Sequence, residues 1–363
     1  MSHHKIQNIT QDDVDQLADF LHRSITDFQE VNPYGSHGVV RSRDEICENL
    51  KSTFEHHLTL DPTGNFGLKL CQDETICGCL LFFPQIYRYQ GKTYRALGSG
   101  SFFVDPKARM QGFFMFRKYL ATPGYDFYFG NTCNTNSIAL WQNCKGHVVP
   151  NSDIEYLILL KPAAIFEELV LRKNKPYLKP LARLAGHLAG CFTTWRRNVD
   201  LEVTPASSHE QLAKIAETVC IDTLVTTDRS VKYLKTRYPN LTQTADKSQP
   251  QIFVIRASQK PCGWFVIDQS KRGKNQQINA ARVLDVVWQR DQITLKQILK
   301  AIASSLDPSI DMISVRARPG ICLDTKMPHS YQRQLPAPES AVLAKCDIEG
   351  LAEKIDFATI DTV

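Results

Sequence analysis

Hydrophobic residues in the first third of the chain follow first a helical and then a strand-like spacing. Apolar residues from Val14 to Ile25 recur every three or four positions, and Ser42 with Glu45 forms the capping signature that begins a second helix. Three stretches rich in β-branched and aromatic residues follow, separated by short polar turns, and each predicts a strand. They are residues 66–72, 76–89 and 94–104.

Helix and strand patterns then alternate up to about residue 162. A strand-to-helix transition over 105–121 precedes a strand at 125–132, a helix at 136–144 and a strand at 154–162. The full order is one strand, two helices, three strands, helix, strand, helix and strand, which predicts a mixed sheet flanked by helices. We therefore expect an α+β fold, an α/β mixed sheet, with a first domain over residues 1–163.

The same order of elements returns after residue 200. A strand and helical segments lead into three strands, a helix and another strand, and a tail with Pro336 and Pro338 ends the chain. This repetition predicts a second domain over 200–363, with the tail packed on it.

The segment between the two blocks, residues 164–199, is basic and amphipathic. It contains no acidic residue from Leu169 to Val199, and apolar residues between Leu178 and Leu188 share one helical face. Such a helix, expected near 176–195, is more typical of a linker packed between domains, and the alternative is peripheral contact with an anionic membrane.

Composition narrows the class of protein. The 363 residues are 43% hydrophobic and 22% charged, which is typical of a globular protein with two cores. A net charge of +5 without a dense basic stripe does not predict a nucleic-acid partner. Eleven scattered cysteines predict neither a disulfide framework nor a metal site, and no signal peptide or membrane span is expected, so the predicted location is cytoplasmic.

Candidate chemistry begins at the loop that precedes the helix after residue 105. Pro106, Arg109 and Gly112 lie at a strand-to-helix transition, where backbone N–H groups are unpaired and the helix dipole is positive. A phosphate group fits such a site, with charge from Arg109 and donors from the amides of Met110 to Phe114. Gly112 is expected to let the backbone approach the anion.

A second stretch, residues 134–143, makes the pattern more specific. The loop residues Pro106, Arg109 and Gly112, together with the later residues Asn134, Asn136, Ser137, Ala139 and Leu140, resemble the two most diagnostic motifs of the GNAT superfamily of acyl-CoA N-acyltransferases. The resemblance implies a cosubstrate, acetyl-CoA or another acyl-CoA, whose pyrophosphate binds the loop and whose pantetheine arm lies along the later helix. The implied cosubstrate-binding residues are Ser101, Phe102, Phe103, Val104, Arg109, Met110, Gln111, Gly112, Phe113, Phe114, Asn134, Asn136, Ser137, Leu140 and Trp141.

Two residues depart from the family pattern. Phe114 stands where a small residue is usual, and Trp141 replaces the tyrosine that in many members protonates the departing CoA thiolate. An indole N–H donates a hydrogen bond but does not supply a proton. Substitutes are water, Ser137 or Tyr128, although Tyr128 also fits a core position and Ser137 a helix start. Glu155 is the candidate general base, and a backbone N–H between Ser101 and Val104 is the candidate donor to the acyl carbonyl.

The second block resembles the same fold without the phosphate loop, because residues 289–293 contain Asp291 and no glycine. The tandem arrangement is similar to GNAT proteins associated with polysaccharide synthesis and, more distantly, to Fem-type aminoacyl transferases. The leading hypothesis is an acyl-CoA-dependent transferase acting on an amine or hydroxyl of a small molecule or sugar. The alternatives are a non-catalytic acyl-CoA or glycan-binding module and a Fem-like aminoacyl transferase. Acceptor specificity is expected from loops such as residues 30–42, and the oligomeric state stays open.

Overall fold

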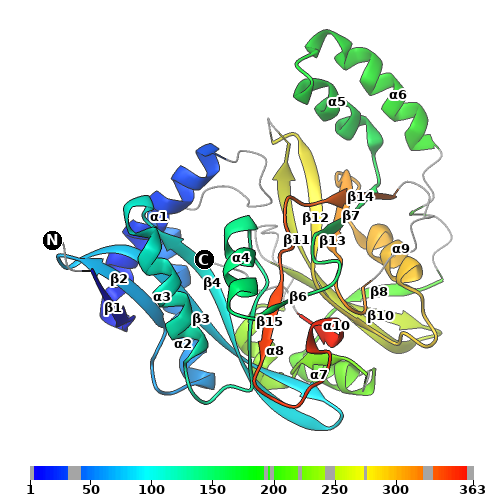
Figure 1. Cartoon of the computed structure of the whole chain (residues 1–363). Coiled ribbons are helices and arrows are strands. Elements are labelled where there is room, and N and C mark those ends of the chain that lie inside the picture. The colour runs from blue at the N-terminus through cyan, green and yellow to red at the C-terminus, as the bar shows by residue number, and fades with distance from the viewer. Residues whose placement is uncertain are drawn as a thin grey trace. The chain divides into compact units, whose positions relative to one another are not determined.

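The computed structural model shows two units, each built on a mixed β-sheet with helices packed against it (Figure 1). Contacts assign residues 1–153, 222–228 and 336–363 to the first unit, and residues 154–221 and 229–335 to the second. The residues that the structure describes are 4–31, 42–191, 195–196, 200–219, 223–241, 250–273, 276–321 and 330–357.

The sheet of the first unit runs in the order β1-β2-β3-β4-β5-β15-β6, and β9 pairs with both β3 and β16. Strands β1 to β4 are antiparallel neighbours, whereas β4 and β5 are parallel. The strands are β1 (His4–Asn8), β2 (Gly67–Gln72), β3 (Thr75–Tyr89), β4 (Lys92–Val104), β5 (Phe127–Gly130), β6 (His147–Val148), β9 (Val225–Thr227), β15 (Ala341–Ala344) and β16 (Ile355–Asp356).

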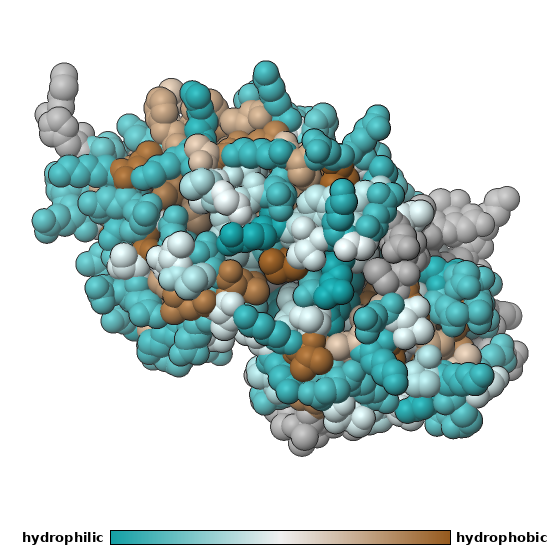
Figure 2. All heavy atoms as spheres, turned by 90° about the horizontal axis from the view of Figure 1, so that it is seen from below, coloured by the Kyte–Doolittle hydropathy of each residue, from teal (hydrophilic) through white to brown (hydrophobic). Residues whose placement is uncertain are grey.

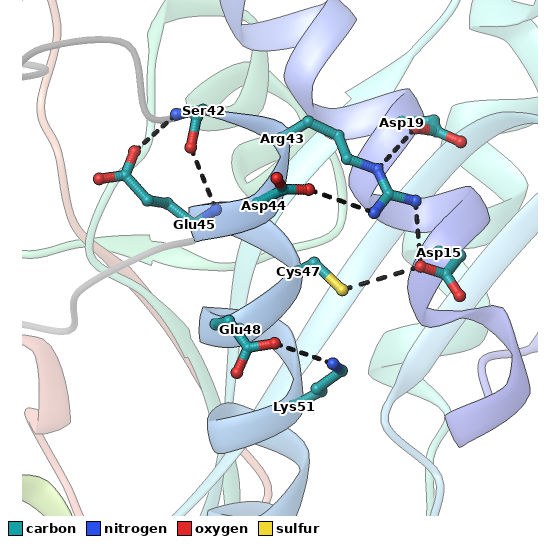
Figure 3. A network of polar contacts seen from close by, with 9 residues as sticks. All are labelled: Asp15, Asp19, Ser42, Arg43, Asp44, Glu45, Cys47, Glu48 and Lys51. Atoms are coloured by element: carbon teal, nitrogen blue, oxygen red, sulfur yellow. Dashed lines mark hydrogen bonds and ion pairs between the residues drawn. The ribbon is translucent and has the colours of Figure 1, made fainter.

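Helices of the first unit cover this sheet and form its cores. They are α1 (Val14–Val31), α2 (Arg43–Leu60), α3 (Arg109–Leu120), α4 (Thr135–Asn143) and α10 (Leu351–Lys354), with 3-10 turns η1 (Gln11–Asp13) and η2 (Pro106–Ala108). The predicted capping box at Ser42 and Glu45 is present at the start of α2. Arg43 next to it donates hydrogen bonds of 3.0 Å to Asp15 and Asp19 and so ties α2 to α1 (Figure 3).

The second unit repeats the same plan. Its sheet runs β14-β7-β13-β12-β11-β10-β8, with antiparallel hairpins followed by a parallel pair, β12 and β13, as in the first unit. The strands are β7 (Ile154–Leu159), β8 (Glu202–Pro205), β10 (Gln251–Ala257), β11 (Lys260–Arg272), β12 (Ile278–Trp288), β13 (Met312–Arg316) and β14 (Ser330–Gln334). The helices are α5 (Pro162–Arg172), α6 (Lys179–Cys191), α7 (His209–Thr218), α8 (Val231–Arg237) and α9 (Leu295–Ser305), with the 3-10 turn η3 (Pro176–Leu178).

The two units exchange a strand, which corrects the sequence-based placement of two segments. The strand at 154–162 was expected to complete the first sheet, but β7 lies between β13 and β14 in the second. The C-terminal tail was expected on the second domain, but its strand β15 lies between β5 and β6 in the first. The physical reason is that a buried strand can form its backbone hydrogen bonds at any matching edge of a sheet. An apolar run in the sequence therefore does not specify which strand it pairs with.

The basic segment forms two helices rather than one linker helix. Helices α5 and α6 pack side by side as a hairpin joined by η3 (Figure 1). Among the described residues, no helix combines the length and the hydrophobicity that crossing a membrane requires.

Candidate active site

The end of β4 leads directly into an uncapped helix. Strand β4 ends at Val104, η2 follows with Pro106 at its first position, and α3 begins at Arg109. The N-cap residue is Ala108, and no side chain of the described residues caps this helix. Because the first amides of a helix have no intrahelical acceptor and carry the positive end of its dipole, α3 offers donors to an anion. Arg109 is exposed at this point and adds a positive charge.

Gly112 has a different role from the expected one. A Cβ at Gly112 would lie 3.2 Å from Val104 Cγ2 and 3.5 Å from Phe102 Cζ. Its missing side chain therefore lets α3 pack closely on β4, and it does not open the backbone toward an anion. Phe114 does not fill the loop, because its side chain is 55% exposed, and Met110 is 76% exposed.

Strand β4 contains a bulge at the position expected to face the acyl group. In its pairing with β3, Phe103 lies opposite Cys79 and Gly100 lies opposite Leu81, so that Ser101 and Phe102 share a single partner residue. Ser101 adopts a φ of 48°, which is uncommon for a residue other than glycine. A bulge leaves the extra residue outside the regular ladder and often lies next to an active site. The buried Ser101 Oγ has no hydrogen-bond partner among the described residues.

The pairing of β4 with β5 ends beside this bulge. Their parallel pairing covers only four residue pairs, from Ala96–Phe127 to Ser99–Gly130, after which β5 ends and β4 continues. Small residues line the point where the pairing ends: a Cβ at Gly98 would lie 2.8 Å from Phe129 Cζ, and one at Gly130 would lie 3.0 Å from Cys133 Sγ. In the sequence, the run of alternating glycine and serine at 98–101 is the signal that could have indicated this end of the strand pairing.

Tyr119 bridges these two strands, and sequence reasoning did not identify it. Its hydroxyl lies 2.6 Å from the Leu97 carbonyl oxygen and 3.1 Å from the Phe129 carbonyl oxygen. Burial raises the Tyr119 pKa well above its ordinary value, so the hydroxyl keeps its proton at neutral pH. The available signal was that a buried tyrosine needs a polar partner.

Removing the Tyr119 hydroxyl tests this bridge. We expect Tyr119→Phe to lower the free energy of unfolding by about 1–3 kcal/mol, because two buried carbonyl groups lose their shared donor. Urea unfolding measures the change. Tyr331→Phe is the control, since the Tyr331 side chain is 60% exposed and its hydroxyl is accessible to water. Equal stability of the two variants would contradict the bridging role.

Helix α4 begins with the predicted asparagine motif. The Asn134 side chain accepts hydrogen bonds of 3.0 Å from the amides of Asn136 and Ser137, and the Asn134 amide donates to Ser137 Oγ at 2.7 Å. Asn134 and Ser137 thus form a reciprocal capping box. Asn136 is exposed and Leu140 is half-buried on the same helix.

Trp141 lies in the core of the first unit. Its side chain is 1% exposed and its ring makes edge contacts with Phe116 and Tyr119, at 5.1 and 6.1 Å between centroids. Burial raises the pKa of the nearby Cys133 thiol to about 12, and the Ser137 and Trp141 side chains offset only part of this rise. Cys133 is therefore a thiol at neutral pH and not a nucleophile.

Tyr128 does not have the surroundings of a general acid. It is fully buried, and its hydroxyl donates to the Thr122 carbonyl oxygen and accepts from Lys345 Nζ at 2.9 Å. Lys345 Nζ also donates to the Leu120 carbonyl oxygen at 2.7 Å. The phenol is thus enclosed by the protein's own groups, and the core interpretation of Tyr128 fits the structure better than the catalytic one.

Glu155 lies on β7 and therefore belongs to the second unit, whereas the bulge on β4 belongs to the first. Its carboxylate is 1% exposed and accepts from Arg272 at 2.9 Å and Arg333 at 3.2 Å. Burial alone would raise the Glu155 pKa, but Arg272, Arg316 and Arg333 together outweigh burial and lower it. A carboxylate held ionised by arginines is a poor general base, since an effective base has a pKa near the working pH. The general-base prediction for Glu155 does not fit this arrangement.

Of the predicted acceptor loop, residues 30–42, positions 32–41 lie outside the described residues. The predicted cosubstrate residues on β4, α3 and α4 all lie in the first unit, around the end of the pairing of β4 with β5.

Comparison with known proteins identifies the fold. Neither a protein-family profile nor a curated protein sequence matches the chain. Solved structures do match: a probable N-acyltransferase from Enterococcus faecalis (TM-score 0.57, 11% identity, 95% of this chain and 73% of that one) and a GCN5-related N-acetyltransferase from Anabaena variabilis (0.55, 11%, 94% and 72%). N-myristoyltransferase from Saccharomyces cerevisiae with bound myristoyl-CoA also matches (0.52, 9%, 87% and 73%).

These likenesses show that the chain has the fold of the GCN5-related acyltransferases, the GNAT fold, as the sequence motifs predicted. At such low identity they define the class of fold, and the chemistry of this chain has to be argued from its own residues.

Proposed function

We propose that the protein is an acyltransferase that moves an acyl group from acyl-CoA to an amine or hydroxyl of a small molecule or sugar. The observation that carries the proposal is the bulge at Ser101, which lies on the same strand that leads into the uncapped start of α3. Strand β4 thus connects two features within the GNAT fold. One is the set of backbone amides that the bulge redirects, and the other is the anion site at the start of α3.

Residues on β4, α3 and α4 each bind a different part of acyl-CoA. Arg109 and the amides of Met110, Gln111, Gly112, Phe113 and Phe114 hold the pyrophosphate, with Gly112 acting through packing. Backbone N–H groups of β4 between Ser101 and Val104 receive the thioester carbonyl and the pantetheine amides. Asn136, Ser137 and Leu140 flank the arm at α4, while Trp141 supports it from the core.

Chemistry at this site relies on positioning and carbonyl polarisation. The acceptor nitrogen or oxygen attacks the thioester carbon and gives up its proton to water, the carbon–sulfur bond breaks, and the CoA thiolate leaves. Tyr119 and Tyr128 are buried and hydrogen-bonded, and Trp141 is a buried indole, so water supplies the proton to the thiolate. Positioning contributes more than a general acid, whose share is about 10²- to 10⁴-fold, so turnover is slow but not abolished.

A second candidate function is a non-catalytic module that binds acyl-CoA. The specific observation that favours it is the buried indole of Trp141, which supplies no proton at the position of the usual phenol. The two functions share the binding site and differ only in turnover.

Calorimetry and a thiol-release assay test both candidates with the full chain. We expect acetyl-CoA to bind with a Kd on the order of micromolar, and no heat with acetyl-CoA would overturn both functions. Release of CoA thiol in the presence of a panel of amines and amino sugars then separates the enzyme from the binding module. Binding without any acceptor-dependent release would establish the module.

Substituting Trp141 by tyrosine tests the role of the missing acid. In the family pattern a phenol at this position protonates the thiolate, so a tyrosine whose hydroxyl reaches the thiolate is expected to make thiol release at least about tenfold faster. Trp264→Tyr is the control, because Trp264 is an equally buried indole in the second unit whose N–H donates to the Leu212 carbonyl oxygen at 3.1 Å. An equal rate for both variants would show that another donor already serves the leaving group.

A further inference from the structure

The helical hairpin of α5, η3 and α6 exposes an unusual share of large apolar side chains. Eight such side chains are exposed among the described residues, and five of them belong to this hairpin, with exposed fractions from 50% to 72%. The surface seen in Figure 2, by comparison, is mainly hydrophilic, with apolar residues in patches between polar side chains. The five residues are Leu169, Tyr177, Leu181, Leu184 and Leu188, and the last four, in η3 and α6, are called here the leucine face.

The leucine face is not used to pack α6 on α5. Helix α6 meets α5 through Gly186, where a Cβ would lie only 2.3 Å from Ala163 Cα. On the same side of α6, Lys179 and Arg183 form ion pairs with Glu167 at 3.4 and 3.2 Å. The contact between the helices is thus made by a glycine and by ion pairs.

Helical geometry places the three leucines of α6 on the side of the helix opposite this contact. Leu181, Leu184 and Leu188 follow the spacing i, i+3, i+7, so they form one stripe directed away from Gly186. Burying a leucine side chain contributes about 1.5–3 kcal/mol of free energy. A binding partner that covers the exposed stripe therefore gains this stabilisation. Contiguous apolar patches of this kind mark interaction surfaces.

Charge decides which partner fits the leucine face. Residues 162–191 contain five basic and two acidic residues, and both acids, Glu167 and Glu168, already form ion pairs with basic residues of the hairpin. Lys173 and Lys175 are exposed beside Tyr177 at the turn between the helices. A second copy of the chain would bring the same basic residues together across a symmetric interface, whereas an anionic lipid surface complements them.

We propose that the leucine face docks the protein onto the surface of an anionic lipid bilayer. Helix α6 has 13 residues, whereas a spanning helix needs about 20, so it lies in the plane of the interface. The leucines enter the boundary between headgroups and acyl chains, Tyr177 lies at the headgroup level, and the lysines of the turn contact the lipid phosphates. The proposal does not depend on the acyl transfer proposed above.

Flotation of the full chain with lipid vesicles tests the docking. We expect the protein to float with vesicles of phosphatidylcholine mixed with phosphatidylserine at low salt, and to be released as the salt concentration rises. Vesicles of phosphatidylcholine alone are expected to retain far less protein. Failure to float with the anionic vesicles at low salt, or equal binding to both kinds, overturns the proposal.

Matched variants separate the two parts of the interaction. Leu188→Glu is expected to reduce the partition onto anionic vesicles at least about tenfold, while Tyr331→Glu, at a side chain of nearly equal exposure on β14, leaves it unchanged. Lys173→Gln with Lys175→Gln is expected to reduce it about tenfold, and the same change at the exposed Lys214 and Lys296 has little effect.

Sedimentation of the protein without lipid tests whether a second copy of the chain covers the leucine face instead. A concentration-dependent dimer that Leu188→Glu dissociates would assign the leucine face to a second copy and overturn the membrane proposal. A monomer that binds anionic vesicles through Leu188 supports it.

Discussion

Replacing Arg109 by glutamate is expected to weaken acetyl-CoA binding about 100-fold. Arg109 is exposed at the first position of α3, next to amides that carry the positive end of the helix dipole. The substitution removes an attraction to the pyrophosphate and adds a repulsion, and a 100-fold change in Kd corresponds to about 2.7 kcal/mol. Isothermal titration calorimetry with acetyl-CoA measures the change in Kd.

Arg117→Glu provides the matched control for this prediction. Arg117 is exposed on the same helix but lies in its last turn, two turns from the proposed phosphate site. The control is expected to bind acetyl-CoA within about threefold of the unchanged protein, since surface charges beyond a Debye length are screened. If the two variants bind acetyl-CoA equally well, the start of α3 does not hold the pyrophosphate.

Alanine in place of Glu155 is expected to destabilise the second unit by about 3–5 kcal/mol. The variant leaves the guanidinium groups of Arg272 and Arg333 without their shared buried carboxylate. Breaking a buried ion pair by removing one partner leaves uncompensated charge, which is why the cost is large. Hydrogen exchange of the amides of β7 and β13, followed by mass spectrometry, measures the loss in this unit.

Glu210→Ala is the control for the buried cluster. Glu210 pairs with Lys235 at 2.9 Å on the surface of the same unit, where both side chains are more than half exposed, and its loss is expected to leave stability nearly unchanged. A similar cost for the two variants would argue against an organising role for Glu155.

The pH dependence of stability gives the Glu155 cluster a second test. The Glu155 pKa is lowered in the folded state, so its stabilisation is complete above the ordinary pKa of 4.5 and is lost as the pH falls through the lower folded value. We therefore expect the stability difference between the unchanged protein and Glu155→Ala to shrink in acid. A difference that stays constant below pH 4.5 would contradict the lowered pKa.

Local sequence signals were sufficient wherever the structure depends on neighbouring residues. The capping box at Ser42 and Glu45 and the helix start at Asn134 and Ser137 form as predicted, because their partners lie within three residues. The strand-to-helix transition after Val104 is predicted for the same reason. These elements are also the ones that carry the proposed cosubstrate site.

Side-chain roles within the site depended on contacts between distant segments. Gly112 matches a phosphate-binding motif, yet its empty side-chain position faces Val104 and Phe102 on another element. Tyr128 could not be distinguished from a catalytic phenol until Lys345, more than two hundred residues away, was found at its hydroxyl. A motif specifies residue types, and only packing decides which way each side chain is turned.

The sequence by itself determined the fold class, the repeated order of elements and the location of the proposed site, since hydrophobic periodicity, caps and turn residues act over short distances. The tertiary structure alone decided that β7 and β15 exchange sheets and that Glu155 belongs to an arginine cluster in the second unit. It also decided that the leucines of α6 remain exposed. The physical reason is that strand edges offer the same backbone hydrogen bonds everywhere, so the choice of partner follows from the packing of the whole chain.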